Sequence, residues 1–374
     1  MGPSRALVKC AGTRTVFKPQ QKCLYKARHT ILGAVTVACF AALALLSASA
    51  QNPSQAPPPG PPVSTPQSPS ITPDNNGTAA GQNSASQDPQ GDAGQFVFRK
   101  QVEEVILHAV VVDQQNDLIA NLPQSEFRVY EDGKPQEITS FHQERVPVAL
   151  GILIDNSGSM RPKREAVNQA ALNLARSSDP QDEIFIVNFG EEYYLDQDFT
   201  NDVSKLQAAL GKIETRGSTA LYDTIVASAA HMKQNAGLQK QVLLVVTDGE
   251  DNASQESLEE TMQQLQQRDS PVVYMIALLN PGKRTSSTIR SLQAISQNTG
   301  GAAYFPADVQ EVEAITRRIA SDIRSQYVIG YKSSSTTTGH KYHAIEVEAY
   351  DGNQRKLRVR TRTGYYSDSA SGAP

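Results

Sequence analysis

Residues 148–159 read VALGILIDNSGS, an unbroken apolar run that leads into a short polar loop. A run of this kind, without alternation, is typical of a strand buried on both faces, as in parallel sheets. Two similar runs follow at residues 184–189 and 242–247, and helical segments are expected between them. The alternation of strand and helix predicts an α/β fold, a doubly wound and mostly parallel sheet with helices on both sides.

The same alternation continues to residue 325. Strands are expected at residues 148–154, 184–189, 193–199 (a short edge strand), 242–247, 272–278 and 302–305. Helices are expected at about residues 162–177, 203–210, 220–235, 257–268, 287–297 and 309–325. Pro162 suits the first turn of the first helix, and Asp308 suits the N-cap of the last. In the strand order 3-2-1-4-5-6 of such sheets, the first and fourth strands are neighbours.

Residues 96–145 and 326–366, on either side of this block, have the pattern of β structure. Strands are expected at residues 105–112, 127–130, 136–141, 327–331, 342–350 and 356–363. Turn signals are expected at residues 131–134 and 351–353. Because one face of so few strands is not stable alone, we expect one small β-sandwich built from both flanks, with residues 146–325 inserted between its halves. Two separate β appendages are the alternative.

Residues 1–50 combine the features of a secretory signal. The stretch from residue 5 to 28 is basic and has no acidic residue, and an apolar run follows at residues 31–46. Ala48 and Ala50 then supply an A-x-A cleavage pattern. The apolar run is short for a membrane span, which needs about 20 residues, so cleavage near Ala50 is favoured over an uncleaved anchor. In both cases the basic flank stays inside and the following residues are exported.

The composition of the chain limits its function further. Residues 51–95 are mainly Pro, Gln, Ser, Gly and Asn, so they are predicted to form a disordered spacer, and residues 367–374 a disordered tail. Cys10, Cys23 and Cys39 all lie in the signal region, so the remaining chain has no disulfide framework and no thiol chemistry. The net charge of −4 offers no basic domain for nucleic acid.

Polar side chains follow two predicted strands that should be neighbours. The first strand runs into Asp155, Ser157 and Ser159, and the fourth runs into Asp248, while Thr219 opens the helix before the fourth strand. Because ligands of doubly wound sheets bind beyond the carboxyl ends of the strands, we expect these residues to face one crevice. An all-oxygen set of hydroxyls and carboxylates suits a hard divalent cation such as Mg²⁺.

The pattern DxSxS with a later Thr and a later Asp resembles the metal-ion-dependent adhesion site of von Willebrand factor A domains, also found in integrins. The resemblance covers about residues 146–325. It implies that the Ser and Thr hydroxyls contact the metal directly, and that the Asp carboxylates do so directly or through water. Mg²⁺ is the expected ion, with Mn²⁺ or Ca²⁺ as alternatives. The stretches FRVYEDGKPQ at 127–136 and GYY at 364–366 resemble a bacterial VWFA-related family of the acidobacterial type.

The same polar residues allow other interpretations. Short Asp/Ser loops are also ordinary helix caps, so the prediction of a metal site depends on all five positions together. His340 and His343 have no third ligand nearby, which argues against zinc. No phosphate-binding loop and no nucleophile elbow is present in the sequence. Residues beside the crevice are expected to be solvated or to pack, namely Tyr193, Tyr194, Tyr222, Glu250 and Asp251.

These observations predict an exported binding or adhesion module, periplasmic, secreted or anchored outside, and not an enzyme. Its partner is expected to be a protein that offers an Asp or Glu carboxylate to the metal. Nucleic acid is not expected as a partner, and the membrane only through an uncleaved anchor. One alternative is an envelope assembly or structural factor in which the metal only stabilises the fold. Another is a hydrolytic enzyme with metal-activated water, although the motif loops contain no histidine as general base.

Overall fold

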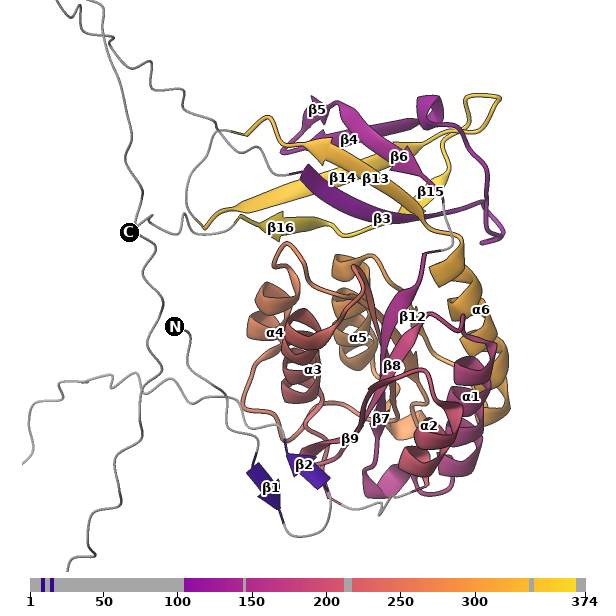
Figure 1. Ribbon diagram of the computed structural model, residues 1–374, viewed down its shortest axis with the longest axis vertical. Coiled ribbons are helices and arrows are strands. Elements are labelled where there is room, and N and C mark those ends of the chain that lie inside the picture. Colours follow the sequence, from indigo (N-terminus) through magenta and orange to yellow (C-terminus); the bar gives the residue numbers. More distant parts are fainter. Residues whose placement is uncertain are drawn as a thin grey trace, which may run out of the picture. The chain divides into compact units, whose positions relative to one another are not determined.

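A sheet of parallel strands forms the centre of the α/β domain (Figure 1). Its strands stand in the order β9-β8-β7-β10-β11-β12, which is the predicted order 3-2-1-4-5-6. Only β9 of these six runs antiparallel to its neighbour. The strands are β7 (Val148–Asp155), β8 (Glu183–Phe189), β9 (Tyr193–Thr200), β10 (Lys240–Thr247), β11 (Val272–Ala277) and β12 (Ala303–Tyr304).

The computed structural model describes residues 8–10, 14–16, 104–143, 146–211, 217–335 and 340–367. The first two of these ranges are the strands β1 (Val8–Cys10) and β2 (Arg14–Val16), which form a short antiparallel pair that extends the sheet beyond β9. The apolar run and cleavage pattern of the predicted signal lie outside the described residues, as do the predicted spacer and nearly all of the tail. Those assignments therefore stay predictions.

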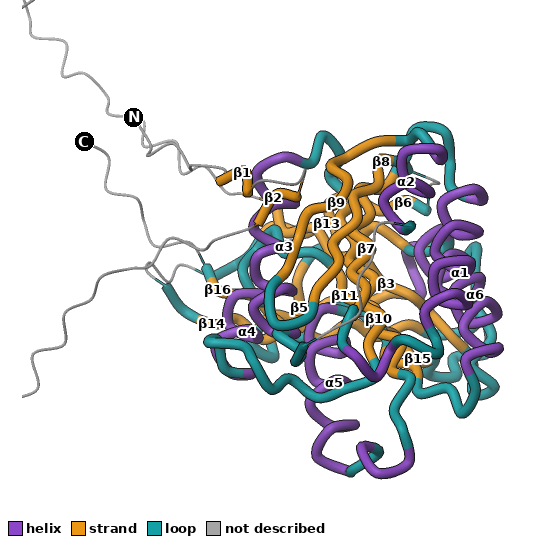
Figure 2. Tube along the Cα trace, turned by 90° about the horizontal axis from the view of Figure 1, so that it is seen from below, coloured by secondary structure: helices purple, strands orange, loops and turns teal. Residues whose placement is uncertain are grey.

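Helices cover both faces of the sheet, as the sequence predicts (Figure 2). Successive residues of β7 explain why: Ile152 and Ile154 enter one apolar core, whereas Leu153 enters the other. The first core also holds side chains from α1 (Arg164–Ser177), α2 (Val203–Leu210) and α6 (Val312–Arg324). The second holds side chains from α3 (Leu221–Asn235), α4 (Leu258–Leu265) and α5 (Ser286–Thr299).

Several predicted helix boundaries were wrong by a few residues, for local reasons. The first helix begins only at Arg164, because a 3-10 turn, η2 (Gly158–Met160), and a turn containing Pro162 precede it. Helix α5 continues to Thr299 and ends at Gly300, whose φ of 91° is the left-handed conformation that suits glycine. Asp308 is an N-cap, as expected, but of the 3-10 turn that leads into α6, η4 (Val309–Glu311).

The two β flanks together build one sandwich. One sheet has the order β15-β3-β13-β6 and the other β16-β14-β4-β5, so each contains strands from both flanks. These strands are β3 (Glu104–Val112), β4 (Phe127–Glu131), β5 (Lys134–Gln136), β6 (Ile138–His142), β13 (Tyr327–Lys332), β14 (Tyr342–Ala349), β15 (Arg358–Arg360) and β16 (Gly364–Tyr366). Leu107, Val129, Ile329 and Val347 share one apolar core between the sheets. The alternative of two separate appendages is wrong.

The turn at residues 131–134 forms as predicted, with positive φ at Asp132 and Gly133 between β4 and β5. The expectation for residues 356–363 was too long, because only Arg358–Arg360 pair as a strand there. β14 and β15 belong to opposite sheets, so the segment between them crosses from one sheet to the other. The remaining short helices are η1 (Gln124–Glu126) and η3 (Pro281–Lys283). Among the described helices, none combines the length and the apolar character needed to cross a membrane.

Candidate metal site

The predicted site lies at the carboxyl ends of β7 and β10, the edge of the sheet that faces away from the sandwich (Figure 1). The two strands pair in parallel, with Leu153 opposite Val245 and Ile154 opposite Val246. In this register Asp155, the last residue of β7, and Asp248, the first residue after β10, lie next to each other at the end of the sheet. Both carboxylates have an exposed fraction of 0%.

Hydrogen bonds join the serines of the motif to the second aspartate. The Oγ atoms of Ser157 and Ser159 are 3.3 Å apart, and Ser159 Oγ donates to Asp248 Oδ1 at 2.7 Å. Thr219 is buried, and its hydroxyl lies beside the residue after Asp248: a Cβ placed on Gly249 would be 3.8 Å from Thr219 Oγ1. The structure therefore brings Asp155, Ser157, Ser159 and Asp248 together, with the Thr219 hydroxyl beside the residue that follows Asp248.

The carboxylate of Asp155 is held rigidly. Its Oδ1 accepts from the backbone N–H of Ser157 at 2.8 Å, and its Oδ2 accepts from Thr247 Oγ1 at 2.7 Å. Burial raises the pKa of Asp155, and the neighbouring charge of Asp248 raises it further, against the lowering effect of the two hydrogen bonds. Two buried carboxylates that repel each other are best accommodated when a positive charge lies between them.

Part of that positive charge comes from Lys163, which the sequence analysis did not identify. Its Nζ donates to Asp248 Oδ2 at 2.8 Å, to the carbonyl of Leu278 at 2.8 Å and to Asn280 Oδ1 at 3.0 Å. The Lys163 side chain is only 16% exposed. No local pattern distinguishes it from other lysines, because its partners are supplied by distant loops. One ammonium against two carboxylates leaves one net negative charge at the site.

The loop after Asp248 positions Thr219. The Thr219 N–H donates to Asn252 Oδ1 at 2.8 Å, and its carbonyl accepts from Asn252 N at 3.0 Å. Asp251 Oδ1 accepts from the N–H groups of Leu221 and Tyr222 at 2.7 and 3.2 Å. The expectation that Asp251 is only a solvated loop carboxylate was therefore wrong, since it caps α3, whose own N-cap residue is an alanine. Glu250 is exposed, as expected.

The donor set of the site fits a hard divalent cation. The five side chains offer only hydroxyl and carboxylate oxygens, which Mg²⁺ prefers over nitrogen or sulfur. Two of the donors are fully buried carboxylates, and the local charge is negative. Tyr193 is buried, in agreement with a packing role, while Tyr222 lines a hollow of about 240 Å³ together with Glu250 and Asp251.

The two histidines considered for zinc do not converge. His340 Nδ1 lies 3.2 Å from the carbonyl of Ser367, whereas His343 Nδ1 lies 2.9 Å from Asp132 Oδ2. Glu131 is close to His343, and the three side chains Glu131, Asp132 and His343 have the spacing of a metal cluster. However, Glu131 already accepts hydrogen bonds from the hydroxyls of Tyr331, Tyr365 and Ser333, which is the arrangement of a satisfied buried carboxylate.

Comparison with known proteins gives one family match. Residues 150–250 match the model of the von Willebrand factor type A domain. No curated protein matches the chain.

Solved structures with a similar fold come from several sources. An aerotolerance-related membrane protein from Bacteroides fragilis has 18% identity, with 47% of this chain and 98% of that chain covered and a TM-score of 0.39. A von Willebrand factor type A protein from Catenulispora acidiphila has 13% identity, coverage of 74% and 76%, and a TM-score of 0.41. The PilB minor pilin from Streptococcus sanguinis has 12% identity, coverage of 49% and 63%, and a TM-score of 0.41.

Proposed function

Because the chain carries a von Willebrand factor type A (VWA) domain, matched over residues 150–250, we propose that it is an exported module that binds a protein partner through a divalent cation. The cation would be held by Asp155, Ser157, Ser159, Thr219 and Asp248. The observation that supports this proposal is the position of the Ser157 and Ser159 hydroxyls beside two completely buried carboxylates, with Thr219 in the adjoining loop.

Each residue of the site has a separate task in this proposal. Asp155, held by Ser157 N and Thr247 Oγ1, supplies fixed negative charge. Lys163 orients Asp248 and limits the charge of the site. A bound Mg²⁺ would supply an electrophilic centre that accepts a carboxylate oxygen from a partner. Hydroxyls, being neutral, leave the ion more of its positive charge than further carboxylates would.

The proposed location is extracytoplasmic. It is supported by the basic flank, apolar run and A-x-A pattern at the amino terminus. A fusion after residue 60 to a reporter that is active only outside the cytoplasm is expected to be active. Export would be contradicted if the fusion stays in the cytoplasm and this reporter is inactive.

The test of the binding mechanism uses two changes at Thr219 in the full chain. Thr219→Val keeps the shape but removes the hydroxyl, and Thr219→Ser keeps the hydroxyl. We expect Thr219→Val to lower Mg²⁺-dependent capture of envelope proteins at least tenfold, as for a contact at the centre of a small interface. Thr219→Ser should retain most of the capture, and the Tm of both variants in chelator should stay close to that of the wild type.

The alternatives give other outcomes in the same experiment. If the metal only stabilises the fold, Thr219→Val will lose the Mg²⁺-dependent rise in Tm while capture by the wild type shows no dependence on Mg²⁺. If the site is catalytic, captured material will be converted by the wild type and not by Thr219→Val. Equal capture by wild type and Thr219→Val would reject the proposed function.

A further inference from the structure

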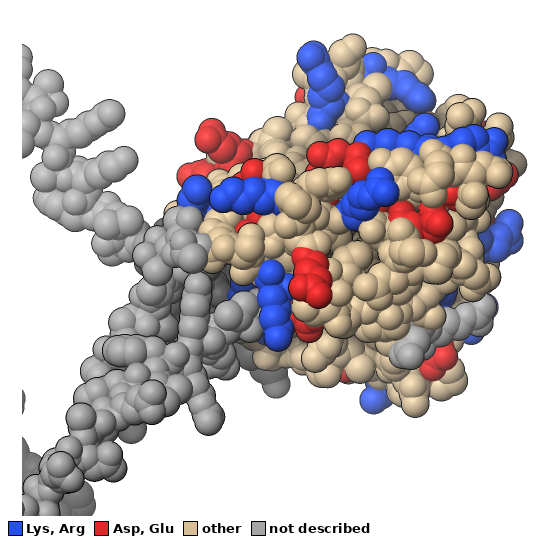
Figure 3. All heavy atoms as spheres, turned by 90° about the horizontal axis from the view of Figure 1, so that it is seen from above, with Lys and Arg blue, Asp and Glu red and all other residues tan. Residues whose placement is uncertain are grey.

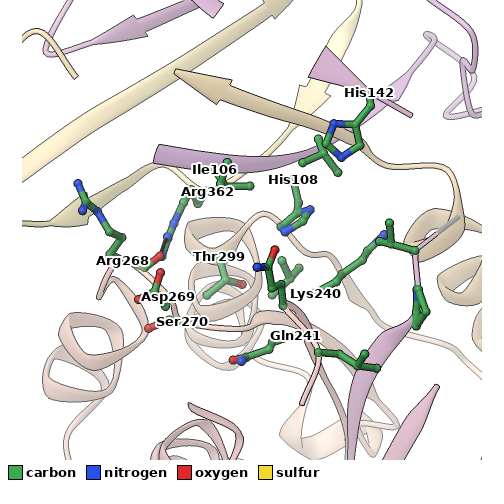
Figure 4. Close-up of a pocket in the computed structure, with 16 residues that line it drawn as sticks. Ile106, His108, His142, Lys240, Gln241, Arg268, Asp269, Ser270, Thr299 and Arg362 are labelled. Atoms are coloured by element: carbon green, nitrogen blue, oxygen red, sulfur yellow. Dashed lines mark hydrogen bonds between the residues drawn. The ribbon is translucent and has the colours of Figure 1, made fainter. Parts of the chain in front are cut away.

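A second hollow lies at the opposite end of the sheet, between the VWA domain and the sandwich (Figure 4). Its volume is about 570 Å³. On the VWA side it is lined by the beginnings of β10 and β11 and by the loop after α4, and on the sandwich side by β3, β6 and β13 and by Arg362. We call it the inter-domain pocket. It contains none of the residues of the metal site.

The lining of the inter-domain pocket is strongly basic. Lys240, Arg268 and Arg362 contribute three basic side chains, and His108 and His142 lie among them. Among the described lining residues the only acidic side chain is Asp269, which is exposed. The outer face of the sandwich differs, because basic and acidic side chains are interspersed there (Figure 3). The excess of positive charge is therefore a local property of the pocket.

Two of these cations, Lys240 and Arg362, donate to backbone carbonyls and form no ion pair within the described part of the chain. The Lys240 ammonium is buried and donates to the carbonyl of Ile323, while the nearest acidic group, Asp182, is already paired with Arg324. The Arg362 guanidinium donates to the carbonyls of Arg268 and Gln267. Burying charges without counterions is costly, so an anion from outside the chain would be favoured in this place.

His108 also offers an unsatisfied polar atom in the pocket. It projects from β3 toward the VWA domain (Figure 4), and its Nδ1 is buried without a hydrogen-bond partner. Burial, together with the nearby charges of Lys240, Arg362 and His142, lowers the pKa of His108 to about 3. At neutral pH the ring is therefore uncharged and can donate one N–H to a ligand.

The pocket also has apolar lining residues. Ile106, two residues before His108 on β3, is 41% exposed and is the only exposed large hydrophobic side chain among the described residues. Val272 and Val328 line the same space. A ligand that fits this lining has an anionic head and an apolar body.

We propose that the inter-domain pocket binds a small organic anion, whose phosphate or carboxylate group lies against Lys240 and His108 and whose apolar body covers Ile106. Such a ligand touches both the VWA domain and the sandwich, so it stabilises the two parts against each other. It binds the native chain only, and the free energy of unfolding therefore rises with its concentration. This site is independent of the divalent cation.

The test uses the full chain in the presence of chelator, which leaves the proposed metal site empty. Phenyl phosphate, benzoate, inorganic phosphate and phenol are titrated by calorimetry and by thermal shift. We expect phenyl phosphate or benzoate to bind with a Kd below about 1 mM, inorganic phosphate at least tenfold more weakly, and phenol not at all. Which of the first two binds more tightly distinguishes a phosphate ligand from a carboxylate ligand.

Variants locate the binding in the pocket. Lys240→Met keeps the packing volume and removes the charge, and we expect it to weaken binding of the better probe at least tenfold. Ile106→Ala, at an exposed position that the fold tolerates, should weaken phenyl phosphate toward the level of inorganic phosphate. Lys233→Met, on the exposed side of α3, is the matched control and should change nothing.

Two results would overturn the proposal. If neither organic anion binds saturably at about 10 mM, the cations serve only to cap the carboxyl ends of α4 and α6, to which their carbonyl partners lie close. If both anions bind equally well to the wild type, Lys240→Met and Ile106→Ala, they bind elsewhere. Either result leaves the proposed function of the metal site untouched.

Discussion

The two ends of the central sheet carry opposite charge. At the carboxyl end, Asp155 and Asp248 are buried, and one ammonium, that of Lys163, contacts Asp248. At the amino end, Lys240 and Arg362 are buried with no carboxylate paired to either among the described residues. Because every parallel strand exposes the same end at the same edge, one sheet can present two chemically different sites. The two proposals thus place a cation at one end and an anion at the other.

The two sites also differ in how they are built. The candidate metal site is formed by the loops after β7 and β10 and by Thr219 just before α3, all within one domain. The inter-domain pocket needs the sandwich, since His108 and Arg362 belong to flanks that are separated in the sequence by the whole VWA domain. Changes at the first site should therefore act within the VWA domain, while changes at the second should also affect how the sandwich is held.

The largest effect is expected for Lys163→Met. Removing one partner of a buried ion pair leaves Asp248 uncompensated, which costs about 3–5 kcal/mol. We expect a loss of this size in the free energy of unfolding, measured with urea in chelator, and a larger Mg²⁺-dependent recovery than in the wild type. Lys233→Met is the control. If Lys163→Met is as stable as the wild type in chelator, the charge balance inferred for this end of the sheet is wrong.

A somewhat smaller effect is expected for Asp155→Asn. In the wild type, Mg²⁺ or Mn²⁺ at 100 times its Kd should raise the free energy of unfolding by about 2.7 kcal/mol. Asp155→Asn should abolish this increase. The fold should persist without metal, because the raised pKa of Asp155 means that its charge is costly in the folded chain. An undiminished metal response in Asp155→Asn, with the exposed Glu259→Gln as reference, would remove Asp155 from the site.

The smallest of these effects is the pH dependence of stability that His108, in the inter-domain pocket, should cause. The pKa of His108 is about 3 in the folded chain, against an ordinary value of 6.5 that applies to the unfolded chain. Between these two pH values the unfolded chain binds a proton that the folded chain excludes. Stability therefore falls as the pH decreases through this window, by about 2 kcal/mol between pH 7 and pH 4.5. His108→Gln should lose less stability than the wild type over the same interval, measured by urea denaturation. An identical pH dependence would show that His108 is not buried in an uncharged state.

Much of the fold could be predicted because its signals are local. The apolar run at β7, the turn at Asp132–Gly133 and the Asp308 cap each depend on a few neighbouring residues. Four of the five candidate site residues could be placed for the same reason, since they follow strands whose order obeys a general rule. The exchange of strands between sheets after β14 was not predictable, because pairing partners are chosen by packing across the core.

The sequence by itself determined the strand order of the VWA domain and the five oxygen donors at its carboxyl edge, because apolar periodicity and strand-end loops are properties of short segments. The tertiary structure alone decided the contact between Lys163 and Asp248, which lie 85 residues apart. It also decided the cap that Asp251 places on α3 from 30 residues away, and the basic pocket between the domains. Charges acquire their partners only when distant segments pack together, and their burial and pKa values follow from that packing.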